Sequence, residues 1–381
     1  MAPGKRDRVL SLLMAMMFSF ALSSLALVVP LLAVSVGYDA AQVGLLVALA
    51  AVTQIGTRLV MGPLTRRVAD KLLLVTSAVL IALACVLIML STTLFVFAAS
   101  QLVQGAARAL FWTSSQTHAV RASSTSVKGL RRMNLAAGVG SLAGPACAGL
   151  LWSLSPPLPL LVAAIVGCIA IMPAALLHRF PLFARKVSSE DRNGHISRQP
   201  GVRAACGMNV AAGAWRSILD SFVPVALSLA GQPAVVIGLL LTTANGAMLA
   251  GSAASSWIRK RGIRASFATG LLCTGLGLAA TAPLATLTLA AAASLALSGL
   301  GAGILQTVGP AIAADEVGPE ERGDALALAG TYRAVALLLA PIGMAGILAF
   351  TPLASSLILA GILITTPATI ALRPPRKWRR I

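Results

Sequence analysis

Charged side chains are scarce in this sequence. Of its 381 residues only 11% are Asp, Glu, Lys or Arg, whereas a soluble domain carries about a quarter. Hydrophobic residues make up 57% of the chain, and its mean hydropathy is +0.88. The apolar residues fall in runs of about twenty, which is the length that a helix needs to cross about 30 Å of hydrocarbon. No alternating ten-residue pattern of a membrane barrel occurs. The sequence therefore predicts an all-α membrane protein.

Groups suited to catalysis are also few. His118 lies at the end of a predicted span, and His178 and His195 lie at or in the central connector. We find no His/Asp/Glu group with metal-ligand spacing, no serine–histidine–acid set on one face and no phosphate-binding glycine loop. The five cysteines lie in or beside apolar spans, where they pack as small hydrophobic residues. We therefore expect no enzyme activity, no metal and no cofactor.

The apolar runs predict about twelve transmembrane helices. Their expected bounds are residues 9–36, 40–62, 72–91, 94–118, 130–153, 157–179, 204–230, 233–257, 265–283, 286–312, 325–349 and 353–372.

The positive charge lies on one side of these spans. A formal net charge of +19 would suggest nucleic acid in a soluble protein. Here Lys and Arg occupy both termini, the central connector and alternate loops, while the other loops, such as residues 154–156 and 350–352, have none. Positive charge stays on the cytoplasmic side. We expect both termini in the cytoplasm of a bacterial-type cell, a multi-pass protein in the inner membrane, and anionic lipid rather than nucleic acid as the partner of these cations.

The chain repeats itself with a shift of 194 residues. In this register the first half matches the second half at glycines, prolines and loop cations rather than at apolar positions alone. The matches are Val29-Pro30 with Val223-Pro224, Gly37 with Gly231, Gly44 with Gly238, Arg67 with Arg261, Gly105 with Gly299, Lys128-Gly129 with Arg322-Gly323 and, with a slip of two, Pro145 with Pro341. We predict two six-helix halves, residues 1–179 and 204–381, joined by a cytoplasmic linker with a short surface helix over residues 180–203.

Three motifs give a resemblance to the major facilitator superfamily over essentially the whole chain. The segment Gly62–Lys71 resembles the signature loop of that family, with Arg66 in place of an acid and Ala69 in place of glycine. Gln101–Gly105 resembles its Arg-x-x-Gln-Gly motif, with Gln101 in place of arginine. Gly140–Gly149 is similar to the glycine–proline motif of its exporters. The resemblance implies two halves around a central cavity, alternating access, and gating roles for Gly62, Arg66, Arg67, Asp70, Gly140, Gly144 and Pro145.

Ionisable residues inside a bilayer are costly unless they are paired or face water. Away from the span ends we find Arg108, Arg216, Asp220 and Arg333. Arg333 is near a span end, so it has the alternative of snorkelling to the interface.

One face of the fourth span is polar. At 100° per residue, its polar stripe consists of Gln101, Gln104, Arg108, Trp112 and Ser115. We expect this stripe to bind substrate; the alternative is an arginine bonded to carbonyl groups between helices.

The seventh span carries Asn209, Arg216 and Asp220 on one face, and the repeat supplies neither charge, because their equivalents are Leu22 and Ala26. Arg216 and Asp220 are within ion-pair reach. We predict that both couple transport to protons and that Arg216 and Asn209 also contact substrate; the alternative is a static pair. Further candidates for the cavity wall, each of which could instead bridge helices, are Asn134, Asn245, Gln306, Tyr332 and Arg333.

Three arginines against one aspartate favour an anionic or zwitterionic solute. Without nucleotide motifs, either an ion gradient or the solute's own gradient must drive transport. We expect a proton-coupled antiporter that exports a small organic metabolite or drug and functions as a monomer; the direction comes from the resemblance only. The alternatives are a proton-coupled importer of an organic anion and, more remotely, a non-transporting membrane sensor.

Overall fold

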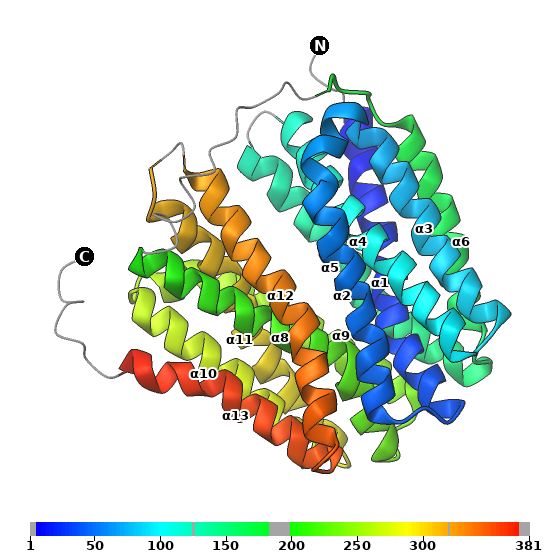
Figure 1. Cartoon of the computed structure of the whole chain (residues 1–381), viewed down its shortest axis with the longest axis vertical. Coiled ribbons are helices and arrows are strands. Elements are labelled where there is room, and N and C mark those ends of the chain that lie inside the picture. Colours follow the sequence, from blue (N-terminus) through cyan, green and yellow to red (C-terminus); the bar gives the residue numbers. More distant parts are fainter. Residues whose placement is uncertain (1–4, 124–125, 183–198, 319–320, 373–381) are drawn as a thin grey trace. The chain divides into compact units, whose positions relative to one another are not determined.

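The computed structural model describes residues 5–123, 126–182, 199–318 and 321–372. These residues form twelve helices with short connections, and no strand occurs among them (Figure 1). The helices are α1 (Lys5–Ser35), α2 (Ala40–Arg67), α3 (Asp70–Leu90), α4 (Leu94–Arg121), α5 (Ser126–Leu154), α6 (Leu158–Leu176), α8 (Pro200–Leu229), α9 (Ala234–Arg259), α10 (Ile263–Thr281), α11 (Thr288–Asp315), α12 (Arg322–Leu348) and α13 (Leu353–Leu372).

Eleven of the described helices are long and apolar enough to cross a membrane. The twelfth, α13, contains a shorter apolar stretch over Leu353–Ala368. The prediction of an all-α multi-pass membrane protein is therefore confirmed.

Several helices are longer than the predicted spans at their basic ends. α2 was expected to end at residue 62 but continues to Arg67, and α4 continues from 118 to Arg121. The segment Gly62–Lys71, expected to be a loop, is therefore helical except at residues 68–69. Hydropathy detects the part of a helix that lies in lipid, whereas Lys and Arg are good helix formers that prolong it into the interface.

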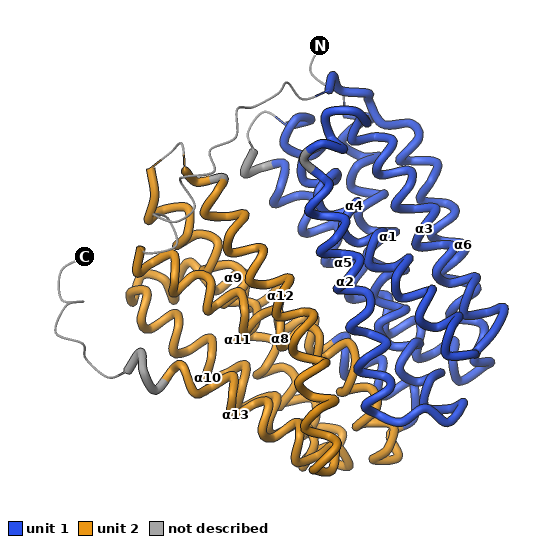
Figure 2. Tube along the Cα trace, viewed as in Figure 1, with its two compact units in different colours: residues 1–187, 233–242 blue, residues 188–232, 243–381 orange. Residues whose placement is uncertain are grey.

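The chain divides into two compact units (Figure 2). The first comprises residues 1–187 and 233–242, and the second comprises residues 188–232 and 243–381. Helix α9 thus contributes its first turns to one unit and the remainder to the other. Helix α8 begins at Pro200, inside the predicted linker 180–203. The surface helix expected within that linker would lie in residues 183–198, outside the described residues, and the predicted domain bounds stay a prediction.

The repeat extends to backbone geometry. Gly37 and Gly231, 194 residues apart, end equivalent helices with φ of 96° and 80°. The Gly37 N–H donates to the Val34 carbonyl and the Gly231 N–H to that of Ser228, each at 3.0 Å. A left-handed residue after the last helical turn favours glycine, because glycine has no Cβ to clash there. The two halves therefore use the same turn at the same position.

Helix packing also repeats, with two exceptions. Within the first unit α1 packs against α5, and α3 against α4 and α6; in the second unit α8 packs against α12, and α10 against α11 and α13. First, α1 packs extensively against α6, whereas the equivalent helices α8 and α13 scarcely touch. Second, α8 packs extensively against α11, whereas the equivalent helices α1 and α4 make few contacts.

Candidate functional site

An arginine inside the second unit contacts two polar side chains, and we call this set the Arg216 triad. Arg216 on α8 donates from Nε to Oδ2 of Asp220 at 2.9 Å and from Nη1 to Oδ1 of Asn245 on α9 at 2.8 Å. The side chain of Arg216 is 18% exposed and that of Asp220 is 7% exposed. A planar guanidinium suits two acceptors at once, because its N–H groups diverge in a fixed fork. The predicted pair of Arg216 and Asp220 thus lies together with Asn245, which we expected separately.

Local helix geometry alone produces the contact between Arg216 and Asp220 in this triad. Residues four apart lie on the same side of a helix, one turn from each other. Asn209 lies on the same face of α8 about two turns earlier, where it is buried and its Nδ2 donates to the Ala205 carbonyl at 2.9 Å. Its side chain also lies against Gly309 of α11. Asn209 is therefore bonded to its own helix and packed against a neighbour.

A second set of polar side-chain contacts joins α12, α11 and α9. Arg333 Nη1 lies 3.5 Å from Oε1 of Gln306, and Gln306 Nε2 donates to Ser252 Oγ at 3.3 Å. A Cβ built on Gly213 of α8 would meet the Arg333 carbonyl at 2.6 Å. Arg333 thus directs its guanidinium toward α11, which argues against the snorkelling alternative.

The polar stripe of α4 lies in the first unit. Gln101, Gln104 and Ser115 are buried, and Arg108 and Trp112 are half-buried. The side-chain nitrogen of Gln101 hydrogen-bonds to no other group in the part of the chain that the structure describes. A buried polar group normally has a partner, so a site that lacks a protein partner is suited to a polar ligand.

Helix α2 adds two residues that our sequence analysis missed. Gln54 and Arg58 lie one turn apart on α2, Gln54 buried and Arg58 half-buried. Helices α2 and α4 pack directly against each other, since Thr53 Oγ1 on α2 donates to the Leu102 carbonyl on α4 at 2.7 Å. The four-residue spacing of Gln54 and Arg58 was a readable signal, but Arg58 was counted with the cytoplasmic cations.

Asn134 and Tyr332 are exposed. Asn134 is exposed on α5, and the side chain of Tyr332 is 45% exposed on α12, in an apolar groove. Trp112 packs edge-on against Phe111, at 5.2 Å between ring centroids. Tyr332 therefore faces the apolar groove, and Asn134 is exposed within its own unit.

A buried acidic and basic set lies at the connector end of the first unit, and we call Asp7, Asp70, His118 and Arg121 the His118 cluster. His118 is fully buried at the end of α4, with Nε2 3.0 Å from Oδ2 of Asp7 and Nδ1 3.3 Å from Oδ2 of Asp70. Arg121 Nη1 lies 3.8 Å from the same Asp70 oxygen. The cluster thereby connects the starts of α1 and α3 to the end of α4.

The chain after α6 closes over this cluster. Asp7 Oδ1 accepts a hydrogen bond from the backbone N–H of His178 at 2.6 Å, and Arg121 Nη2 donates to the Pro181 carbonyl at 2.5 Å. Phe180 lies under the Arg121 guanidinium at 4.9 Å. Of these residues we expected a gating role only for Asp70. The other expected gating cations, Arg66 and Arg67, are exposed at the end of α2.

The glycine–proline motif of α5 is a packing surface. A Cβ on Gly140 would overlap the Met16 carbonyl of α1, and one on Gly144 would overlap the Ser23 hydroxyl. On the other side, the Pro145 carbonyl lies against Gly238 of α9. These residues allow α5 to approach α1 and the first turns of α9 at backbone distance.

A family model for the Major Facilitator Superfamily matches residues 11–341. The chain belongs to this superfamily. The comparison with curated proteins gives no match. The chain is similar in structure to the nucleoside transporter NupG, with a TM-score of 0.81 at 12% identity over 98% of this chain and 100% of that one.

Two further solved structures are similar at 12% identity. A POT family transporter in complex with a thioalcohol-conjugated peptide has a TM-score of 0.73 and covers 96% of this chain and 95% of that one. A bacterial homologue of the human lysosomal transporter Spinster, inward-facing and unoccupied, has a TM-score of 0.70 over 97% and 95%. Identities this low show the fold alone. The superfamily membership identifies a multi-pass membrane transporter of a small-molecule substrate.

Proposed function

We propose that the protein is a proton-coupled transporter of a small anionic or zwitterionic organic solute, with Asp220 as the group that carries the proton. The Arg216 triad is the observation that supports this proposal. It places one carboxylate and one guanidinium in contact within a membrane-spanning helix, at 2.9 Å. Such a pair exchanges partners when either charge changes.

Protonation of Asp220 is the proposed switch. With Asp220 ionised, its carboxylate neutralises Arg216, and the pair needs no further counter-charge. A proton on Asp220 removes that neutralisation, and a cation inside the bilayer without a counter-charge is costly. Arg216 then binds a carboxylate or phosphate group of the solute, which guanidinium holds through two parallel hydrogen bonds. Asn245 keeps its bond to Nη1 and so preserves the direction of the guanidinium.

The cycle closes when Asp220 loses its proton. The carboxylate then competes with the solute for Arg216, and the solute leaves, so proton and solute cross the membrane in the same direction. With a zwitterionic solute, one proton moving through 100 mV supplies about 2.3 kcal/mol, which supports a solute gradient of about 40-fold because 1.4 kcal/mol corresponds to tenfold.

The charges on the membrane helices support an anionic or zwitterionic solute. Away from the ends of the candidate membrane spans, Arg108, Arg216 and Arg333 lie on α4, α8 and α12, against one carboxylate at Asp220. Arg58 lies near the end of the span on α2. We assign substrate contacts to Arg108, Gln101, Gln104 and Trp112 in the first unit and to Arg333 and Gln306 in the second. An inner-membrane location and cytoplasmic termini belong to the same proposal and follow from the placement of the basic loops, and we propose a monomer. The glycine–proline motif favours export, whereas the cycle above favours import, so the direction is decided by the test below.

The test is proton movement in liposomes. Metabolite profiles of a deletion strain and a complemented strain first identify the solute, which accumulates inside deleted cells if the protein exports it. Purified protein is then reconstituted with a pH-sensitive dye inside, and a solute gradient is applied. We expect wild-type protein to move protons and Asp220→Asn to lose that movement, while Asp324→Asn, outside the triad, keeps it. Undiminished proton-coupled transport in Asp220→Asn would overturn the coupling role. Depletion of the solute inside deleted cells would indicate import.

A further inference from the structure

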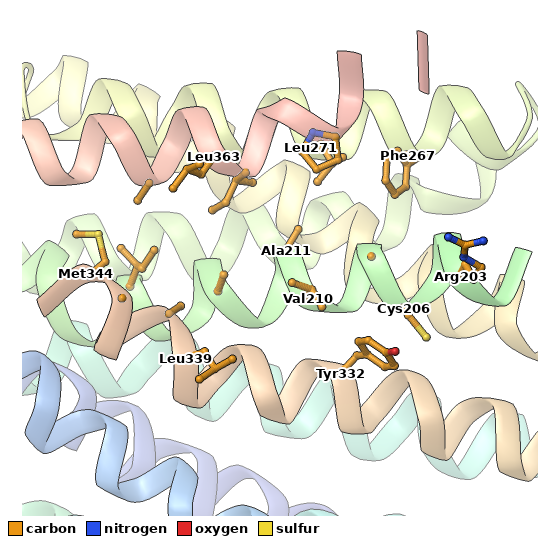
Figure 3. Close-up of a pocket in the computed structure, with 18 of the residues that line it drawn as sticks. Arg203, Cys206, Val210, Ala211, Phe267, Leu271, Tyr332, Leu339, Met344 and Leu363 are labelled. Carbon is orange, nitrogen blue, oxygen red and sulfur yellow. The ribbon is translucent and has the colours of Figure 1, made fainter. Parts of the chain in front are cut away.

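An apolar groove lies in the second unit between α12 and α13, with α8 and α10 beneath (Figure 3). Its volume is about 570 Å³. Val210, Leu339 and Leu363 on its walls are 38%, 57% and 62% exposed. Within a membrane-spanning segment, apolar walls this open are covered by lipid rather than by water.

The groove occupies a place that is filled by protein in the other half. In the first unit α1 packs along α6, but the equivalent helices α8 and α13 scarcely touch. Residues of α8, such as Val210 and Ala214, and of α13, such as Leu363, face the groove instead. The repeat thus identifies the groove as a helix contact that is missing from the second unit.

The groove is separate from the Arg216 triad. Arg203, Val210 and Ala214 face the groove from α8. At 100° per residue their mean direction is about 120° away from that of Arg216 and Asp220 with Asn209. One face of α8 therefore carries the proposed transport site, and another face forms the groove.

One end of the groove is polar. Arg203, the fourth residue of α8, and the hydroxyl of Tyr332 lie toward the same end in Figure 3, whereas Met344 lies toward the other. Arg203 forms no ion pair within the described ranges. From Arg203 to Ile218 the groove follows α8 for about 22 Å, which exceeds the depth of one leaflet, about 15 Å.

We propose that this groove binds one anionic glycerophospholipid, with an acyl chain between α12 and α13 and the phosphate at Arg203. The apolar walls suit a hydrocarbon chain, and they offer almost no hydrogen-bonding group to an entering peptide, whose backbone would remain unsatisfied. A single cation at the membrane boundary favours a lipid with net negative charge over a zwitterionic one. The hydroxyl of Tyr332 donates to the same headgroup.

Glycines on α12 provide matched variants for a test. A Cβ added to Gly343, which lines the groove, or to Gly346, which does not, meets nothing within 4 Å, so both positions accept a side chain. Gly343→Leu fills the groove, while Gly346→Leu places the same side chain elsewhere on the same helix. Arg203→Gln removes the headgroup contact, and Arg203→Lys keeps the charge.

The experiment is native mass spectrometry of the full chain titrated with phosphatidylglycerol, phosphatidylcholine or glycerol phosphate. We expect one phosphatidylglycerol to bind about fivefold more tightly than phosphatidylcholine, the ratio that one arginine near an anionic headgroup gives, about 1 kcal/mol. Arg203→Gln removes this preference, Arg203→Lys restores it, and Gly343→Leu loses the bound lipid while Gly346→Leu retains it. Glycerol phosphate, which has no acyl chain, does not bind.

Two results would overturn the proposal. Equal retention of the two lipids that is insensitive to Arg203→Gln would show that no anionic headgroup is recognised. Equal lipid binding by Gly343→Leu and Gly346→Leu would show that the bound lipid lies outside the groove.

Discussion

Asp70 and Arg264 occupy equivalent positions in the two halves, 194 residues apart, and carry opposite charges. Each lies in the first turn of its helix, α3 or α10. The charge is also inverted at the residue that pairs with Asp70. This residue, Arg121 at the end of α4, is equivalent to Asp315 at the end of α11, which pairs with Arg259 of α9. Both halves therefore hold the end of the fourth helix of their repeat by an ion pair, with the polarity exchanged.

The two ion pairs should differ in strength. Asp70 is almost fully buried, whereas the side chains of Arg259 and Asp315 are 41% and 54% exposed. In double-mutant cycles with Asp70→Asn and Arg121→Gln, we expect a coupling energy of about 1–3 kcal/mol. The cycle with Arg259→Gln and Asp315→Asn should give at most about 1 kcal/mol, since solvent screens an exposed pair. Thermal denaturation in detergent provides the measurement; equal coupling in both cycles would contradict the burial argument.

Replacement of His118 by leucine should destabilise the first unit by about 3 kcal/mol. The ring lies between two buried carboxylates, and its removal leaves Asp7 with only the His178 N–H and Asp70 with only the more distant Arg121 as partners. His178→Leu is the matched control, because Asp7 accepts from the backbone N–H of that residue and not from its ring. A thermal midpoint lowered equally by both substitutions would show that the contact between His118 and the acids contributes little.

Alanine should be harmful at Gly140 and Gly144 and harmless at Gly330. A methyl group at the first two positions overlaps backbone or hydroxyl atoms of α1, whereas the space around Gly330 of α12 is open. Overpacking costs about 1–3 kcal/mol per site, while alanine in an open helical position stabilises by up to about 1 kcal/mol. The yield of monodisperse protein and its melting temperature report the difference. A neutral Gly140→Ala would mean that α1 and α5 separate at little cost.

Arg216→Lys should lower transport about tenfold or more without unfolding the protein. An ammonium group keeps the positive charge but lacks the fork that holds Asp220 and Asn245 together. Arg259→Lys, a similar exchange at an exposed ion pair, should leave transport unchanged. The initial rate of solute uptake into liposomes measures both. Wild-type rates in Arg216→Lys would indicate that charge alone, and not the geometry of the triad, is sufficient.

Sequence reasoning predicted the fold well because lipid restricts the solutions open to a chain. Twelve apolar runs, the positions of Gly37 and Gly231 and the 194-residue repeat each have a counterpart in the structure. The pairing of Arg216 with Asp220 followed from a spacing of four on one helix. The contact between Arg216 and Asn245 could not be predicted in this way, because the two residues lie on different helices and no local sequence pattern indicates that α9 approaches α8 there.

The His118 cluster was missed for a related reason. Asp7 stands among Lys5, Arg6 and Arg8, so it was natural to count the segment as a solvated, basic terminus. The residues that bury Asp7, His118 and the chain around Phe180, are more than 100 positions away. A lone acid among cations at a helix start was the only local signal.

Helix α9 imposes a condition on any attempt to divide the chain. Its residues 234–242 pack with the first unit, where Ala234 covers Gly149 and Gly238 covers the Pro145 carbonyl. A polypeptide cut at 187 would leave that strip of α5 bare, so the amino-terminal fragment should be poorly soluble when produced alone. Co-expression with the carboxy-terminal fragment should restore it, which makes fragment complementation, rather than isolated halves, the practical route to labelling one half at a time.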